Sequence, residues 1–374
     1  MKIQDITAYG LRGRTPEGGW SNELQPEDCV HTIIRIQTDE GLTGWGSVFT
    51  SEALVKASLE ILRPLAIGEN ALEPERVSEK LHQNTFWLGR GGSITHAISG
   101  VGIALWDILG KACGQPVGRL LGGRYRERVR PYASLLMREP ERMADELSPV
   151  KAQGFRAFKI GWGPFGRRDA KTDEAIVRAA REAIGDDAQL MVDAGGSDAY
   201  WRGGLKWALR TAEMLEDYDV FWFEEALHPD AFDDYVALRD GSRVSIAGGE
   251  VLTRRQAFAP WLEGGAFDIV QPDVTKCGGL SEQRRIAWNA REHGVRFIPH
   301  GWNTTVGLAS DLQIASAFPD TDLVEYLTGS PFIDELRVGG WRLDADGMLA
   351  IPDGPGLGVE INLDALGEFA RVRI

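Results

Sequence analysis

The sequence predicts an α/β protein built around a closed (β/α)8 barrel. From about residue 130, eight short apolar segments alternate with helical segments of ten or more residues. Such alternation is typical of parallel strands joined by crossover helices. A polar residue also lies near the end of most of these strands, which is where barrel enzymes place their sites. A doubly wound open sheet is the alternative for the same alternation.

The composition describes a large globular chain with an acidic balance. The chain has 374 residues, of which 43% are hydrophobic and 26% charged, and its formal net charge is -14. This charge disfavours nucleic-acid and anionic-membrane partners, because the overall field repels phosphates. It is compatible with a small anionic substrate, since a local cation or metal ion reverses the field inside a site.

The cysteines and the N-terminus predict a cytoplasmic protein. Cys29, Cys113 and Cys277 are far apart and odd in number, so they form neither a disulfide framework nor a metal motif. The first ten residues lack the apolar core of a signal peptide. No continuous run of about 18 apolar residues is present, so we expect no membrane partner.

The region before residue 125 has its own pattern of alternating strands and amphipathic helices. The elements predicted there are a strand at 5–11, a loop at 15–28, a hairpin at 29–48, and helices at 53–68 and 94–114. Gly114 is the expected stop of the second helix.

The barrel region is predicted element by element from the same periodicities. The strands are expected at 129–136, 155–160, 189–194, 220–225, 244–250, 267–273, 295–300 and 322–327. The helices between them include 171–185, 204–216 and 281–294.

Three carboxylates at successive strand ends predict a site for a hard divalent cation. Asp193, Glu224 and Glu250 offer only oxygen ligands, which Mg²⁺ prefers and zinc does not. Glu225 adjoins Glu224, and side chains alternate along a strand, so we expect Glu225 to point away into the surrounding shell. A single acidic residue at a strand end is more often a helix cap or a turn residue; one polar residue on each of six strands is harder to explain that way.

Lys159 and His300 are the candidate proton carriers. They end the second and the seventh strand, so the ring of strands places them on different sides of the barrel axis. Asp273 ends the sixth strand beside His300, where a carboxylate fixes the imidazole tautomer and raises its basicity. The alternatives are a surface lysine and a core or turn histidine.

An ordered set of motifs resembles the enolase superfamily, and within it the mandelate racemase-like subgroup. The motifs are VGIALWDILGKACGQPVGRLLGG, MVDAGG, FWFEEALHP, GGE, QPDVTKCGG and PDGPGLGVEINLDAL. The resemblance covers essentially the whole chain. It implies one Mg²⁺ per subunit on Asp193, Glu224 and Glu250, with Asp273 and His300 as a His–Asp pair.

The resemblance also assigns roles to two further positions and shows one departure. Lys159 falls on the second lysine of the family's Lys-x-Lys motif, and Glu325 on the glutamate that hydrogen-bonds the substrate carboxylate opposite the metal. We expect Glu325 to be protonated, with its pKa raised by neighbouring carboxylates. Ala157 replaces the first lysine. That loss should leave Lys159 a weaker base, and it weighs against a symmetric two-base racemase.

The fold implied is an α+β capping domain over a modified (β/α)7β-barrel. We expect the capping domain at 1–125, the barrel at 126–345 and a C-terminal return to the cap at 346–374. The resemblance further implies a homo-oligomer, either an octamer or a dimer.

The chemistry implied is abstraction of the proton α to a carboxylate, stabilised by the metal ion. We favour dehydration of a sugar acid, either an aldonate or an aldarate, to a 2-keto-3-deoxy acid. The alternatives are racemisation or epimerisation, cycloisomerisation, and a binding protein that kept the metal site. Specificity is expected from the loop Thr15–Glu27 with Trp20, from Thr50–Glu52, and from Trp302 and Asn303.

Overall fold

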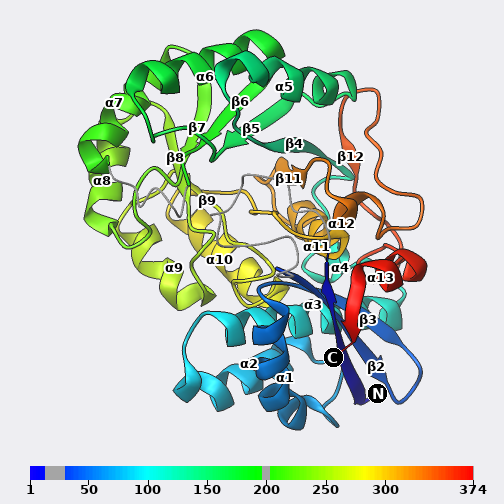
Figure 1. Cartoon of the computed structure of the whole chain (residues 1–374). Helices are drawn as coiled ribbons and strands as arrows, with labels where there is room; N and C mark the ends of the chain where they lie inside the picture. Colours follow the sequence, from blue (N-terminus) through cyan, green and yellow to red (C-terminus); the bar gives the residue numbers. More distant parts are fainter. Residues whose placement is uncertain (13–29, 196–202, 374) are drawn as a thin grey trace.

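The structure, a computed structural model, describes residues 1–12, 30–195 and 203–373. It contains a barrel and a smaller domain packed against one end of it (Figure 1). The predicted loop Thr15–Glu27, with Trp20, lies outside the described residues, as does Cys29.

Eight parallel strands form the barrel, and each coincides with a strand predicted from the sequence. They are β4 (Arg128–Leu136), β5 (Ala157–Gly161), β6 (Gln189–Asp193), β7 (Val220–Glu224), β8 (Ser245–Gly248), β9 (Ile269–Val270), β10 (Arg296–Phe297) and β11 (Leu323–Leu327). The hydrogen-bonded order runs from β10 down to β4 and then to β11. The pairing of β11 with β4 brings the last strand next to the first.

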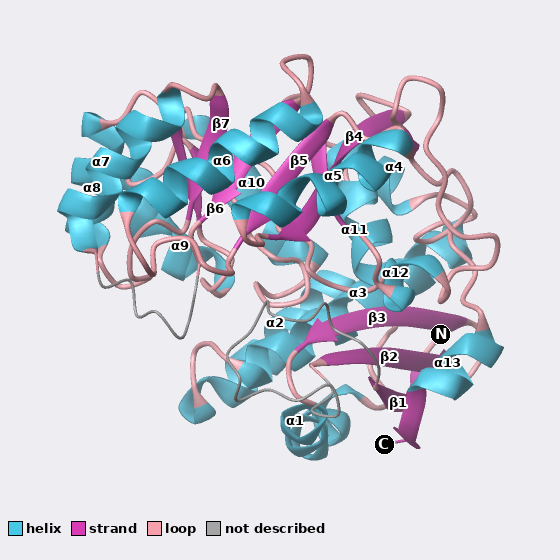
Figure 2. Cartoon of the chain, turned by 45° about the horizontal axis from the view of Figure 1, so that its top comes forward, coloured by secondary structure: helices cyan, strands magenta, loops and turns pink. Residues whose placement is uncertain are grey.

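Seven full helices cover the strands from outside (Figure 2). They are α5 (Met143–Ala152), α6 (Ala170–Ile184), α7 (Gly204–Glu216), α8 (Phe232–Gly241), α9 (Arg254–Glu263), α10 (Leu280–Glu292) and α11 (Thr305–Ser316). The position of an eighth barrel helix, directly after β11, holds the four-residue helix α12 (Pro331–Asp334). The fold is therefore a (β/α)7β-barrel, which confirms the modified barrel that the resemblance implied.

Helix α6 illustrates why these segments become helices. Asp169 caps its N-terminus, because the carboxylate accepts a hydrogen bond from the Thr172 N–H at 2.9 Å. Ile176, Val177 and Ala180 recur at helical spacing and are fully buried. The N-terminal cap and the spacing of the buried residues therefore both favour a helix in this segment.

The capping domain contains strands from both ends of the chain. Its antiparallel sheet has the order β13, β1, β2, β3. The strands are β1 (Ile3–Leu11), β2 (His31–Thr38), β3 (Thr43–Phe49) and β13 (Ala370–Arg373); the helices are α1 (Glu52–Ala66), α2 (Pro74–Thr85) and α3 (Ser93–Cys113). The short elements are η2 (Phe86–Leu88), α4 (Val117–Leu120), η3 (Pro140–Arg142), β12 (Leu349–Ala350), which pairs with β4, and α13 (Leu363–Phe369).

Helix α3 is the central element of the capping core. Its Gly100 lies so close to Gly46 of β3 that a Cβ on either residue would overlap the opposite element. Within the described residues, α3 is the one helix long and apolar enough to cross a membrane. Because 83% of that apolar window is buried inside the structure, α3 is the core helix of this fold.

The interior of the barrel is filled by a separate ring of side chains, contributed by all eight strand regions. These are Tyr132, Ala157, Met191, Trp222, Ala247, Ile269, Ile298 and Leu323. They close the barrel below the level of the polar residues. The site described next therefore has a solid apolar floor.

Candidate active site

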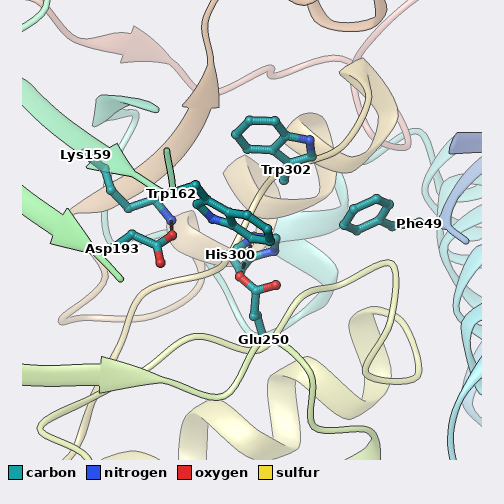
Figure 3. Close-up of a pocket in the computed structure, with 7 residues that line it drawn as sticks. All are labelled: Phe49, Lys159, Trp162, Asp193, Glu250, His300 and Trp302. Carbon is teal, nitrogen blue, oxygen red and sulfur yellow. Dashed lines mark ion pairs between the residues drawn. The ribbon is translucent and has the colours of Figure 1, made fainter. Parts of the chain in front are cut away.

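A pocket at the carboxyl ends of the barrel strands brings the candidate residues together (Figure 3). Its cavity volume is about 40 Å³. The residues that line it come from the barrel and, in the case of Phe49, from the capping domain: Phe49, Lys159, Trp162, Asp193, Glu250, His300 and Trp302. Lys159 stands in the middle of β5, not at its end as the sequence predicted, and Glu325 stands in the middle of β11.

Lys159 forms one wall of the site, surrounded by three carboxylates. Its Nζ lies 2.6 Å from Glu224 Oε1, 3.1 Å from Glu325 Oε1 and 3.3 Å from Asp193 Oδ2. Burial opposes the charged ammonium, but these carboxylates outweigh it and hold the pKa of Lys159 well above its usual value. Lys159 is therefore protonated in this structure.

Asp193 and Glu224 are register neighbours on the adjacent strands β6 and β7. Burial and the proximity of other carboxylates raise the pKa of Asp193, against the effect of Lys159, and raise that of Glu224 to about 7. Glu224 Oε2 also accepts hydrogen bonds from Trp222 Nε1 at 2.8 Å and Gln271 Nε2 at 2.9 Å. Two buried carboxylates thus lie side by side, each in contact with Lys159.

His300 forms the opposite wall, paired with Asp273 as predicted from the sequence. The His300 Nδ1 lies 2.8 Å from Asp273 Oδ2, and the two residues form an isolated parallel bridge. Thr275 orients Asp273, because its N–H and its hydroxyl each lie 2.6 Å from Asp273 Oδ1. Burial disfavours the imidazolium, but Glu250, Glu325 and Asp273 outweigh it and hold the pKa of His300 well above its usual value.

Glu250 belongs to the His300 wall in this structure. Its Oε2 lies 2.8 Å from His300 Nε2, and its Oε1 accepts a hydrogen bond from Lys276 Nζ at 3.2 Å. Burial opposes ionisation, yet these two cations hold the pKa of Glu250 well below its usual value. Sequence reasoning missed Lys276, although the motif QPDVTKCGG contains it.

The three predicted ligands fit a divalent cation by donor chemistry, although they are not preassembled around one point. Among the described residues, no group of three or more His, Cys, Asp or Glu side chains is arranged to hold a metal ion as it stands. Lys159 Nζ lies between Asp193 and Glu224, and Glu250 faces His300. The donors are nonetheless all carboxylate oxygens at the ends of three consecutive strands, which is the donor type that a hard divalent cation takes.

Glu225 does not point away from the site, so that expectation was wrong. Strand β7 ends at Glu224, and Glu225 has a positive φ of 47°, which breaks the alternation on which the expectation rested. A Cβ added to Gly195 would lie 2.8 Å from Glu225 Oε2 and 2.9 Å from Asp193 Oδ1. Burial and the charges of Glu250 and Asp193 hold the pKa of Glu225 well above its usual value.

The expected protonation of Glu325 is also wrong for this structure. Its Oε2 accepts hydrogen bonds from the Gly301 N–H at 2.7 Å and the Tyr132 hydroxyl at 3.2 Å. Burial opposes ionisation, but Lys159 and His300 outweigh it and lower the pKa of Glu325. The sequence showed the neighbouring carboxylates, but it could not show that cations and N–H donors converge on this one.

Ala157, which replaces the motif's first lysine, lies in the apolar interior of the barrel. Ala157 and Lys159 share one face of β5, and Ala157 lies in the inner apolar ring one step below the ammonium. Tyr132 and Trp222 pack edge to face in the same ring, with centroids 5.2 Å apart. The floor beneath Lys159 is therefore aromatic.

The two residues after His300 have different surroundings. Trp302 lines the pocket, as expected. Asn303 does not: it is fully buried, and its side chain packs against Gly307 in the first turn of α11.

Phe49 and Trp162 line the pocket but were not predicted. The signals available were the position of Phe49 just before Thr50–Glu52 and that of Trp162 between glycines at the end of β5.

Fold and site together define a (β/α)7β-barrel with a carboxylate-rich pocket between a lysine and a histidine–aspartate pair. Comparison with known proteins gives the family. Residues 27–122 match the N-terminal domain of the mandelate racemase / muconate lactonizing enzyme family, and residues 142–365 match the enolase C-terminal domain-like family. The chain belongs to this family of the enolase superfamily, as its motifs indicated.

Three relatives illustrate the similarity. The chain is 36% identical to D-galactarolactone cycloisomerase from Agrobacterium fabrum, over 99% of both chains. It is 32% identical to D-xylonate dehydratase from Haloferax volcanii, over 97% of this chain and 93% of the relative. The crystal structure of 3,6-anhydro-D-galactonate cycloisomerase from Zobellia galactanivorans superposes with a TM-score of 0.88, at 30% identity and with full coverage of both chains.

Proposed function

We propose that this chain is a sugar-acid dehydratase, which converts an aldonate or aldarate to a 2-keto-3-deoxy acid. The observation that carries the proposal is the placement of two proton carriers, Lys159 and His300, on opposite walls of one carboxylate-lined pocket. Elimination of water needs a base for the α-proton and an acid for the departing hydroxyl. The similarity to D-xylonate dehydratase supports this reaction class.

Asp193, Glu224 and Glu250 would hold a Mg²⁺ ion, one per subunit. When bound, Mg²⁺ supplies positive charge beside the substrate carboxylate and so makes the α-proton more acidic. Glu250 must turn from His300 Nε2 to join the other two carboxylates. The same movement frees the His300 ring nitrogen that faces the pocket.

The chain's own residues then divide the proton transfers. Lys159 and His300 are both protonated while their carboxylate partners face them. The one that serves as base must first lose its proton, and the other keeps its proton for the departing oxygen. Asp273 fixes the tautomer of His300 by accepting from Nδ1, which directs Nε2 toward the substrate.

A second candidate is cycloisomerisation, which the two cycloisomerase relatives favour. The chemistry begins in the same way, with removal of the α-proton. The leaving group is then an oxygen of the substrate's own ring, so the product is an isomer of the substrate and no water is released.

A panel of sugar acids tests both candidates. The purified enzyme is incubated with aldonates, aldarates and their ring forms in the presence of Mg²⁺, and new keto groups are measured by semicarbazide absorbance. Mass spectrometry separates a product lighter by one water, expected for the dehydratase, from one of unchanged mass, expected for the cycloisomerase. Deuterium exchange at C2 with an inverted epimer and no keto product would instead indicate an epimerase. Absence of exchange and product across the panel would contradict the proposal.

A further inference from the structure

Glu250 differs from the other two proposed metal ligands in how its backbone is held. Asp193 and Glu224 are the last residues of β6 and β7, and they are paired in register within the barrel sheet. Strand β8 ends at Gly248, so Glu250 lies on the loop that follows, after Gly249 with a φ of +107°. The sheet therefore fixes the backbone of two carboxylates, whereas the orientation of Glu250 depends on what its side chain contacts.

Within the described residues, two side chains hold the Glu250 carboxylate. His300 Nε2 lies 2.8 Å from Oε2 (Figure 3), and Lys276 Nζ donates a hydrogen bond to Oε1 at 3.2 Å. The contact with His300 is lost when Glu250 turns toward Asp193 and Glu224, as the proposed Mg²⁺ site requires. Of the two partners, Lys276 is then the one that can still fix the carboxylate.

Lys276 is itself held firmly between the barrel and the capping domain. Its Nζ lies 4.4 Å from the centroid of the Phe49 ring, and the residue is only 8% exposed. Its backbone belongs to a tight turn closed by Asp273. The Lys276 N–H donates to the Asp273 carbonyl at 3.1 Å, and the Thr275 N–H to Asp273 Oδ1 at 2.6 Å. The ammonium therefore reaches Glu250 from a preorganised position.

We propose that Lys276 is the positioning residue for Glu250, an inference that rests on the Mg²⁺ site of the proposed function. Lys276 keeps its hydrogen bond to one carboxylate oxygen while the other oxygen leaves His300 Nε2 for the metal ion. Hydrogen bonds of this kind orient ligating side chains, and their removal weakens metal binding by about 10- to 100-fold. Through Phe49, the capping domain thereby helps to hold a ligand that belongs to the barrel.

The charge of Lys276 and its orienting hydrogen bond predict opposite effects on metal binding. The ammonium is a positive charge beside the place of a divalent cation, so its removal by itself should strengthen Mg²⁺ binding. Loss of the hydrogen bond should weaken binding, because Glu250 is then left without a partner once it leaves His300. We expect orientation to prevail, so the sign of the change tests the inference.

The first test measures Mg²⁺ binding by calorimetry, without substrate or turnover. Lys276→Met keeps most of the length of the side chain and removes its donor. We expect its Kd for Mg²⁺ to be about tenfold or more above that of the wild type. Lys276→Gln, which is shorter and uncharged, should also raise the Kd, and it takes the place of Lys276→Met if that variant does not fold. An unchanged or lower Kd in a folded variant would overturn the inference.

Lys111→Met is the matched control. Lys111 Nζ lies 2.7 Å from Oδ2 of Asp107, a buried carboxylate of the capping helix α3, and Lys111 does not line the pocket. This variant also takes a lysine from a buried carboxylate, so the Kd for Mg²⁺ should stay at the wild-type value. A rise equal to that of Lys276→Met would show a general effect of losing such a pair and would overturn the assignment. Circular dichroism establishes that each variant is folded.

The second test asks whether Lys276 acts through Glu250. Mn²⁺ is the probe, because the electron paramagnetic resonance signal of free Mn²⁺ also measures weak binding. Lys276→Met should raise the Kd for Mn²⁺ in the wild-type background. It should cause no further rise in Glu250→Ala, in which Asp193 and Glu224 remain. An equal rise in both backgrounds would mean that Lys276 acts elsewhere, and would overturn the inference.

The third test concerns the capping domain. Phe49→Leu removes the ring face beside the ammonium and leaves an apolar side chain there, and we expect a Kd for Mg²⁺ about two- to fivefold higher. An unchanged Kd would overturn the part assigned to the capping domain. Absence of Mg²⁺ binding by the wild type would overturn the proposed metal site together with this inference. Binding that Glu250→Ala weakens and Lys276→Met does not would overturn this inference and leave the proposed function in place.

Discussion

The two walls of the pocket carry the same kind of group but are built differently. Lys159 projects from the middle of β5, and its partners Asp193, Glu224 and Glu325 also stand on barrel strands. His300 and Asp273 follow their strands on loops, by three residues each. The Lys159 wall is therefore fixed by the barrel alone.

The His300 wall, by contrast, extends into the capping domain. Lys276 connects Glu250 to Phe49, and Ser47 of the cap lies within hydrogen-bond distance, 2.9 Å, of Thr304 in the loop after His300. The comparison shows that the capping domain is linked by these contacts to the His300 wall, whereas the partners of Lys159 all stand on barrel strands.

The largest effect is expected at the proposed Mg²⁺ site, which would take ligands from both walls. Glu250→Gln should lower kcat by about 10³-fold or more, because bound metal supplies several kcal/mol of stabilisation. Calorimetry should show weakened Mg²⁺ binding, with an unchanged circular dichroism spectrum as the control for folding. Excess chelator should inactivate the wild type equally. Full activity in either case would exclude the metal-assisted mechanism.

Single substitutions of the proton carriers distinguish the roles of the walls. Lys159→Met and His300→Asn should each lower kcat by about 10²- to 10⁴-fold, the usual contribution of a general acid or base. The variant that lacks the base should also lose deuterium exchange at C2 in D₂O, whereas the variant that lacks the acid should retain it. Wild-type exchange and turnover in both variants would contradict the assignment.

Asp273→Asn should have a milder effect confined to the histidine wall. An amide oxygen is a weaker acceptor for the N–H at His300 Nδ1 than a carboxylate is. The substitution should therefore hold the imidazole less firmly in one tautomer and lower its basicity. We expect a loss of about 10- to 100-fold in kcat, with Mg²⁺ affinity retained. A loss as large as that of His300→Asn would mean that Asp273 does more than position the imidazole.

The smallest effect concerns a buried histidine behind the same wall. Burial lowers the pKa of His31 to about 4, so the folded state holds it neutral. Between about pH 4 and 6.5 the unfolded state binds more protons at His31 than the folded state does. The contribution of neutral His31 to the free energy of unfolding is therefore complete above about pH 6.5 and is lost as pH falls. At pH 5 the free energy of unfolding is lower by about 2 kcal/mol for this reason.

Denaturant unfolding at pH 7 and pH 5 measures this cost. The decrease in the free energy of unfolding should be about 2 kcal/mol smaller in His31→Gln than in the wild type. His228→Gln is the control, because His228 lies in a barrel loop with a side chain that is 53% exposed. The same pH dependence in wild type and His31→Gln would contradict the neutral, buried state of His31.

The sequence by itself determined the barrel and the positions of its polar residues. Parallel strands bring their carboxyl ends to one rim, so Asp193, Glu224 and Glu250 had to be neighbours once the strands were identified. The pairing of Asp273 with His300 followed from the same rule, because they end adjacent strands. These inferences depend on periodicity, which is a local property of the chain.

Only the tertiary structure decided how the side chains between these positions are used. Glu225 turns into the site through a left-handed backbone, and Phe49 arrives from a different domain. Glu325 is ionised because Lys159, His300 and the Gly301 N–H converge on it. Such outcomes depend on backbone angles at strand ends and on contacts between distant segments, neither of which the alternation of apolar residues encodes.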